Sequence, residues 1–296
     1  MRFCCLILAF GILGFALGCR EKEVSIGGIE EIQPAPATAK VEVKPSTTKL
    51  DPPDHSLNLT EYISAGVPAI DHAWTGAELS EALRVLKSIS QSDSSRLPRF
   101  KSDRSGDLFS RLASEENLKP FQDESRPAKD RLSDSVPYID ASNHMTKMYL
   151  ESAQTQATGG AEVIELVGSN LRLSIAIVKA IEEYLPTLSK SDPGYEYRIN
   201  NLKAIQNGIG GMISGSVRLL TEGQTYKSPE LKKLIEYQLT TLPTIYPDLT
   251  PEAQEDILTR LDKYSKDQQM SYLNPGLTEL SAKVKEAAEK FKKALP

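Results

Sequence analysis

One segment of this sequence is apolar around most of a helical circumference, and that restricts the fold more than any other feature. Between residues 161 and 185, apolar side chains recur at alternating steps of three and four, the period of an α-helix. A second apolar row lies beside the first, so a helix of this kind belongs inside a bundle. Charged residues recur along the segment and exclude a membrane span. The polar positions form a narrow seam: Glu165, Arg172, Lys179 and Glu183.

The remainder of the body also shows helical periodicity. After a turn at Pro186 and Pro193, a second long helix is predicted over 195–221, antiparallel to the first. Residues 97–104, and the polar stretch with Pro120, Pro127 and Pro137, are predicted to be irregular. Further helices are predicted over 76–90, 108–112, 229–242, 251–266 and 275–294. We therefore predict an all-α fold, an irregular multi-helix bundle around a long antiparallel helix pair, preceded by a disordered tether.

The N-terminus has the pattern of an export signal. Met1-Arg2 provides a positive charge, and residues 3–17 form an apolar run that is short for a membrane span. The run ends in Ala16-Leu17-Gly18-Cys19, which resembles the lipobox of bacterial lipoproteins, with Ala16 where Leu is usual. The resemblance covers only the first nineteen residues. It implies that residues 1–18 are a cleaved signal peptide and that Cys19 is lipidated. An ordinary secretory signal or an uncleaved anchor is the alternative.

The cysteine and proline content agrees with this interpretation. Cys4 and Cys5 would leave with the signal, and no cysteine follows Cys19. Residues 19–56, which include five prolines, cannot bury enough apolar surface to fold, so we predict a lipidated Cys followed by a flexible tether. As a coil the tether would span on the order of 35 Å. The body then divides into an N-terminal helical subregion with loops (57–135) and a C-terminal helical bundle (136–296).

Three groups of residues are candidates for a site. Arg96, Arg99, Lys101 and Arg104 lie in the one stretch with excess positive charge, and could contact an anionic surface or an acidic partner. A solvated loop with local ion pairs is the more ordinary explanation. Asp71, His72 and Trp74 lie together before the 76–90 helix, but one His and one Asp do not make a catalytic set without a nucleophile. Trp74 is more simply explained as a core anchor.

The third group is a cluster of glycines in the second long helix, Gly208, Gly210, Gly211 and Gly215. A phosphate loop would require a lysine after its second glycine and a preceding strand, and neither is present. Because each mid-helix glycine costs about 1 kcal/mol relative to alanine, we expect the cluster to serve close packing against 161–185, with Gly211 and Gly215 on the contact face. A kink that admits a ligand is the alternative.

These features predict the cellular location of the protein more clearly than its activity. The net charge of −5 argues against a nucleic-acid partner, and three cysteines and three histidines leave little material for a metal site, so neither a metal nor a cofactor is expected. We expect an exported lipoprotein that is anchored by its lipid to a bacterial cell membrane, on the periplasmic or surface side. We expect its body to act as a non-catalytic binding or structural module, with an envelope protein as a candidate partner. The alternative is an enzyme or small-ligand carrier with a cleft between the N-terminal subregion and the bundle.

Overall fold

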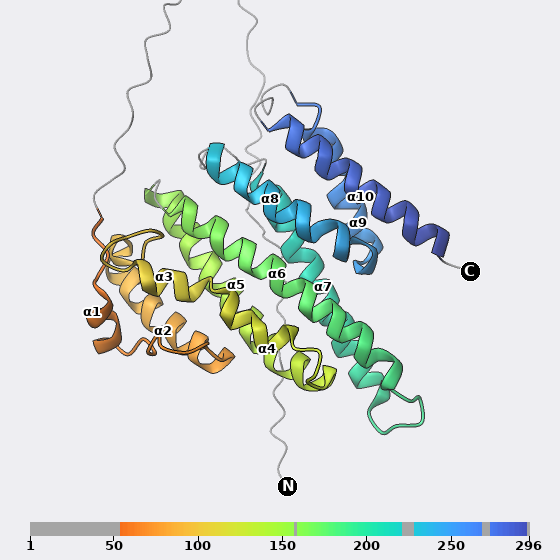
Figure 1. Cartoon of the computed structure of the whole chain (residues 1–296), viewed down its shortest axis with the longest axis horizontal. Helices are drawn as coiled ribbons and strands as arrows, with labels where there is room; N and C mark the ends of the chain where they lie inside the picture. Colours follow the sequence, from red (N-terminus) through yellow and green to blue (C-terminus); the bar gives the residue numbers. More distant parts are fainter. Residues whose placement is uncertain (1–53, 157–158, 221–227, 268–272, 295–296) are drawn as a thin grey trace, which may run out of the picture.

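The computed structural model describes residues 54–156, 159–220, 228–267 and 273–294, and within these ranges every regular element is a helix (Figure 1). The predicted all-α bundle is therefore confirmed. The predicted signal peptide, Cys19 and most of the predicted tether lie outside the described residues. The α-helices are α1 (Leu59–Ser64), α2 (Gly76–Ser92), α3 (Gly106–Leu112), α4 (Lys119–Gln122), α5 (Ala128–Gln156), α6 (Gly160–Tyr184), α7 (Tyr195–Leu219), α8 (Ser228–Ile245), α9 (Pro251–Tyr264) and α10 (Asn274–Ala294).

Within the described ranges, four short 3₁₀ helices connect these elements: η1 (Ser94–Arg96), η2 (Glu115–Leu118), η3 (Leu185–Thr187) and η4 (Tyr246–Asp248). Helices α2, α5, α6, α8 and α10 follow one another side by side, each in contact with the next, and α7 packs on α9 (Figure 1). Helix α6 is the middle member of this row and is buried along most of its length, as its apolar circumference predicts. Its most extensive contacts are with α5 and α8, whereas its antiparallel neighbour α7 contacts it less extensively.

Helix α5 corrects the prediction of an irregular stretch through Pro127 and Pro137. Its 29 residues begin directly after Pro127 and include Pro137. The helix continues through the predicted boundary between residues 135 and 136, so the two predicted subregions share one element. Its buried face includes small polar residues, which obscure the apolar period in the sequence. Those with buried side chains are Ser135, Ser142, Thr146 and Ser152.

Three polar residues of α5 are hydrogen-bonded to Asn170 of α6. The Asn170 side chain accepts a hydrogen bond from Ser142 Oγ at 2.5 Å, and its amide nitrogen donates to Asn143 Oδ1 at 3.1 Å and to Thr146 Oγ1 at 3.2 Å. All four groups belong to the interface of α5 and α6. Because a buried polar group without a partner is costly, this network favours one register of the two helices.

The glycine cluster on α7 packs differently from the prediction. Gly211 is exposed, and a Cβ built there would meet nothing within 4 Å, so its predicted role in packing is wrong. Gly210 is the buried glycine, and its partner is Ala253 of α9, whose Cβ would lie 3.2 Å from an added Cβ. Outside this cluster, Gly168 of α6 adjoins a bulky side chain, the ring of Tyr237, which rests on it.

Candidate functional site

The four predicted contact residues lie on or beside one loop, which connects η1 to α3 and is irregular as predicted. Pro98 and the left-handed backbone of Lys101, with φ of 60°, keep the loop out of a helix. Arg96, Lys101 and Arg104 are exposed, whereas Arg99 is half-buried. Exposed carboxylates accompany them, at Asp93, Asp103 and Asp107, so the local excess of positive charge is small.

The same loop holds the first described residues of the chain. Ser105 Oγ donates to Ser56 Oγ at 3.0 Å, and Ser102 Oγ hydrogen-bonds to the Asp54 carboxylate. Partial burial raises the pKa of Asp54, but the hydrogen bonds from Ser102 and Ser56 outweigh it and hold the pKa below its usual value. Ser56, the last residue of the predicted tether, is fully buried. The end of the predicted tether therefore packs on the body.

Tyr62 strengthens this junction from helix α1. Its hydroxyl donates to the Arg96 carbonyl at 2.5 Å and accepts from the Leu57 amide at 3.2 Å, and its ring is fully buried. The arrangement places the predicted contact residues at the point where the segment that precedes residue 54 joins the body.

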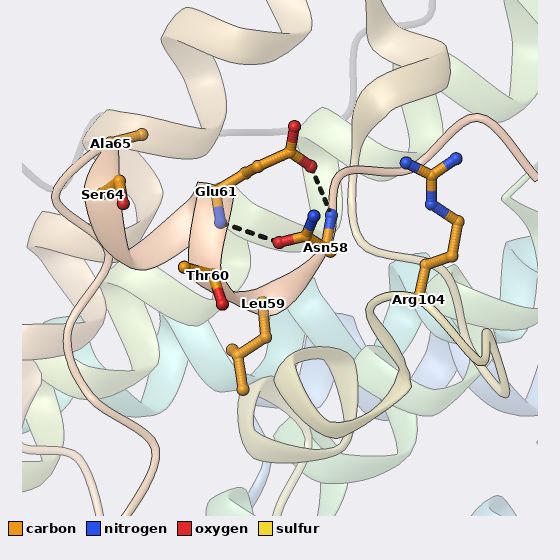
Figure 2. A pocket seen from close by; sticks show the side chains of 7 residues that line it. All are labelled: Asn58, Leu59, Thr60, Glu61, Ser64, Ala65 and Arg104. Atoms are coloured by element: carbon orange, nitrogen blue, oxygen red, sulfur yellow. Dashed lines mark hydrogen bonds between the residues drawn. The ribbon is translucent and has the colours of Figure 1, made fainter.

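A hollow of about 710 Å³ opens beside this junction (Figure 2). Arg104 forms one wall of it and helix α1 the other. Two of the polar residues that line it are paired with each other, because Asn58 Oδ1 accepts from the Glu61 amide at 3.0 Å and Glu61 Oε2 accepts from the Asn58 amide at 2.8 Å. Arg104 is exposed at the rim, and Glu61, the other charged residue of the lining, is held by its hydrogen bond to the Asn58 amide.

Arg99 points into the body and pairs with Glu162, in the first turn of α6. Glu162 Oε1 accepts from Arg99 Nε at 3.0 Å and from the Phe100 amide at 2.6 Å, while the Glu162 side chain is only 2% exposed. The sequence did not indicate that Glu162 is buried, since its partners precede it by more than sixty residues. The ion pair fastens the loop to the bundle, and Arg99 therefore has a structural role.

A polar cluster on α6 and α8 lies next to this ion pair. Lys233 pairs with Glu165, and the Tyr237 hydroxyl donates to Glu165 Oε2 at 2.8 Å. Burial and the Glu165 carboxylate both raise the pKa of Tyr237. The Tyr237 ring has Arg172 Cζ at 5.2 Å and Lys233 Nζ at 5.6 Å from its centre, both within range of a cation–π contact. Each charged side chain in the cluster pairs with a side chain of opposite charge. Such pairing is typical of polar residues that stabilise a contact between two helices.

Asp71 and His72 contact each other but form no catalytic set with Arg99. His72 Nδ1 lies 2.7 Å from Asp71 Oδ1, and Nε2 lies 2.6 Å from Glu78 Oε1, so both ring nitrogens are occupied. The hydrogen bonds to Asp71 and Glu78 raise the pKa of His72. Trp74 is 2% exposed and donates from Nε1 to the Ala69 carbonyl at 2.7 Å, which confirms it as a core anchor.

Among the described residues, no group of histidine, cysteine and carboxylate side chains could hold a metal ion. Within the same ranges, no helix is both long enough and apolar enough to cross a membrane. Comparisons with protein-family models, with curated proteins and with solved structures found no match to this chain.

Proposed function

We propose that this protein is an exported lipoprotein, anchored in a bacterial cell envelope through lipid on Cys19, whose helical body serves as a non-catalytic binding or structural module. The observation that carries the proposal is the lipobox-like sequence Ala16-Leu17-Gly18-Cys19 at the end of an apolar run. Each buried CH₂ group of an acyl chain contributes about 0.8 kcal/mol to membrane binding. One chain alone binds only weakly, whereas two or more chains on one cysteine anchor a protein stably.

The geometry of the junction supports this assignment. An anchored chain must attach its body to the tether at a defined point, and Asp54, Ser56 and Leu57 are hydrogen-bonded to the loop that carries the exposed side chains of Arg96, Lys101 and Arg104. Residue 54, where the predicted tether meets the body, therefore lies beside this loop. We propose this loop as the contact with anionic headgroups or with an envelope partner.

No observation favours the alternative of an enzyme or carrier. Helix α2 packs directly on α5, where a Cβ at Gly76 would lie 3.0 Å from the Tyr138 nitrogen, so the two helices leave no space at this point. The hollows described are beside α1 and beside η4.

Replacement of Cys19 tests the proposal. Wild-type protein should stay with the membrane fraction through a high-salt wash, and Cys19→Ser should not be retained by a lipid. Cys4→Ser is the matched control, since this cysteine precedes the cut and its loss should leave the protein membrane-bound. Retention of Cys19→Ser in washed membranes would indicate an uncleaved anchor, and release of the wild type would show that no anchor exists.

A further inference from the structure

The imidazole ring of His72 lies between two carboxylates in the segment that connects α1 to α2. Its Nδ1 is 2.7 Å from Asp71 Oδ1, and its Nε2 is 2.6 Å from Glu78 Oε1. An ionised carboxylate accepts hydrogen bonds but donates none, and a neutral imidazole has only one N–H group. Both contacts are therefore hydrogen bonds only when both ring nitrogens carry a proton, so the geometry fits the imidazolium form of His72.

Both carboxyl groups are held in the ionised form by their neighbours. The hydrogen bond from His72 lowers the pKa of Asp71, and the Thr75 amide, which donates to Glu78 Oε2 at 2.8 Å, lowers the pKa of Glu78. Glu78 closes the capping box at the start of α2, where the helix dipole also favours an anion. Its second oxygen, Oε1, faces His72, so the ring ties the connecting segment to the first turn of α2.

Arg111 of α3 faces the same group of side chains. Its Nη2 donates to the Ile70 carbonyl at 2.7 Å, and its Nη1 lies 3.8 Å from Glu116 Oε2. Its positive charge contributes to the low pKa of Asp71. Because a guanidinium stays protonated in proteins, Arg111 supplies a constant attraction and no pH dependence.

The other elements near the start of α2 add no group that titrates near neutral pH and contacts the two carboxylates. On α5, the residues against Gly76 are Pro137 and Tyr138, and burial raises the pKa of Tyr138 to about 12. The neighbouring charged groups on α2, α4 and α5 have partners of opposite charge: Glu81 with Arg84, Lys119 with Glu116, Asp134 with Arg126 and Asp140 with His144. Arg96 of η1 lies at the other end of α2. Among the described residues that contact Asp71 and Glu78, His72 is therefore the one that changes charge near neutral pH.

Trp74 reports on the same turn of the chain. Its indole Nε1 donates to the Ala69 carbonyl at 2.7 Å, and its backbone amide donates to Asn117 Oδ1 at 2.9 Å. The first of these bonds closes the turn 69–74 around His72, and neither bond titrates. Trp74 is the only tryptophan of the chain, so its indole gives a single signal from this turn.

We propose that His72 is a proton-operated clasp that holds the turn 69–74 on the first turn of α2. With the imidazole protonated, both carboxylates accept a hydrogen bond and the turn is closed. When one proton leaves at higher pH, a nitrogen lone pair faces a carboxylate, one hydrogen bond is lost and the turn opens more often. Because α1 precedes this turn and α2 follows it, the proton on His72 sets how firmly the two helices are connected.

The direction of the effect follows from linkage. The hydrogen bonds to Asp71 and to Glu78 raise the pKa of His72 above its usual value of about 6.5. A group whose pKa is raised in the closed form stabilises that form fully below the pKa of the open form, and the effect is lost as the pH rises through the raised pKa. The clasp therefore holds in mild acid and releases as the pH rises above about 6.5.

NMR and hydrogen–deuterium exchange on the full chain, between about pH 5.5 and 8.5, test the clasp. In the wild type, the indole signal of Trp74 should shift with the same midpoint as the imidazole signals of His72. Opening of the turn, measured from exchange of peptides that cover residues 69–78 and corrected for intrinsic exchange, should increase over the same range. The increase should approach tenfold for each unit by which the pKa of His72 exceeds its value in the unfolded chain.

His72→Gln removes the titrating group while its amide still donates to a carboxylate, and the exposure of His72 makes the variant a small risk to folding. In this variant the pH dependence of the Trp74 signal and of exchange should disappear. His144→Gln is the matched control, since His144 also adjoins a carboxylate, with Nδ1 at 3.7 Å from Asp140 Oδ1, but lies on α5; the wild-type behaviour of Trp74 should persist. A Trp74 signal or an exchange rate that does not follow the titration of His72 would overturn the clasp. The wild-type pH dependence in His72→Gln would overturn it as well.

Discussion

Gly168 is the glycine on which the packing of α6 against α8 depends, and replacing it with alanine is the most informative perturbation of the fold. A Cβ at this position would lie 2.7 Å from Tyr237 Cζ, with two other ring carbons closer still. Carbon atoms in contact are about 3.5–4.0 Å apart, so the ring must move by about 1 Å. The Tyr237 hydroxyl would then lose its hydrogen bond to the Glu165 carboxylate, and the ring would move relative to Lys233 and Arg172.

The cost can be estimated from these contacts. A hydrogen bond to a charged group contributes about 1.5–3 kcal/mol, and each cation–π contact at a partly exposed site contributes about 0.5–1 kcal/mol. Alanine regains up to about 1 kcal/mol over glycine in a helix. We therefore expect Gly168→Ala to lower the free energy of unfolding by about 2 kcal/mol, and to lower Tm by about 4–8 °C in a body of this size.

Gly211→Ala is the matched control, because the same methyl group is added to a helix where it meets nothing within 4 Å. It should stabilise the protein by up to about 1 kcal/mol. Thermal and urea unfolding of both variants measures the two signs. In a Tyr237→Ala background the penalty of Gly168→Ala should disappear. If Gly168→Ala stabilises the wild type as Gly211→Ala does, the account of the α6–α8 contact is wrong.

Two further predictions concern the ion pair and the histidine. Arg99→Ala should lower the free energy of unfolding, measured in urea, by about 2–3 kcal/mol, because it leaves the buried Glu162 carboxylate without its cation. Arg104→Ala, at an exposed side chain, should change it by less than about 0.5 kcal/mol. Equal effects of the two variants would refute the structural role of Arg99. The pKa of His72, followed by NMR, should lie above the usual histidine value, and Asp71→Asn should lower it, since the hydrogen bond to Asp71 is the main cause of the shift; an unchanged titration would show that this contact does not form.

The sequence predicted those helices whose buried side chains are apolar. Helix α6 and the starts of α8 and α9 were identified from an apolar period or from Pro at the first turn, because these signals depend on local chain geometry. Helix α5 was not, since Pro137 and buried residues such as Ser142 interrupt the period, and the partner of Ser142 is supplied by α6.

The contacts of the candidate site depend on distant parts of the chain and could not be predicted in the same way. Arg99 and the Phe100 amide both donate to Oε1 of the buried Glu162, and the sequence does not show that these groups meet. The glycines show the same limit. The cluster of four glycines in α7 is the more conspicuous pattern in the sequence, whereas Gly168, a single glycine in an apolar stretch, contacts the ring of Tyr237. A single glycine between Glu165 and Arg172, on the polar seam of a buried helix, was the signal that could have indicated it.

The mature N-terminus tests the central claim most directly. Mass spectrometry of the N-terminal peptide, released from protein purified out of washed membranes, reports both the cut and the modification. We predict a peptide that begins at Cys19 and carries the added mass of two or three acyl chains. A peptide that retains residues before Cys19, or an unmodified Cys19, would contradict the assignment of this chain as a lipoprotein.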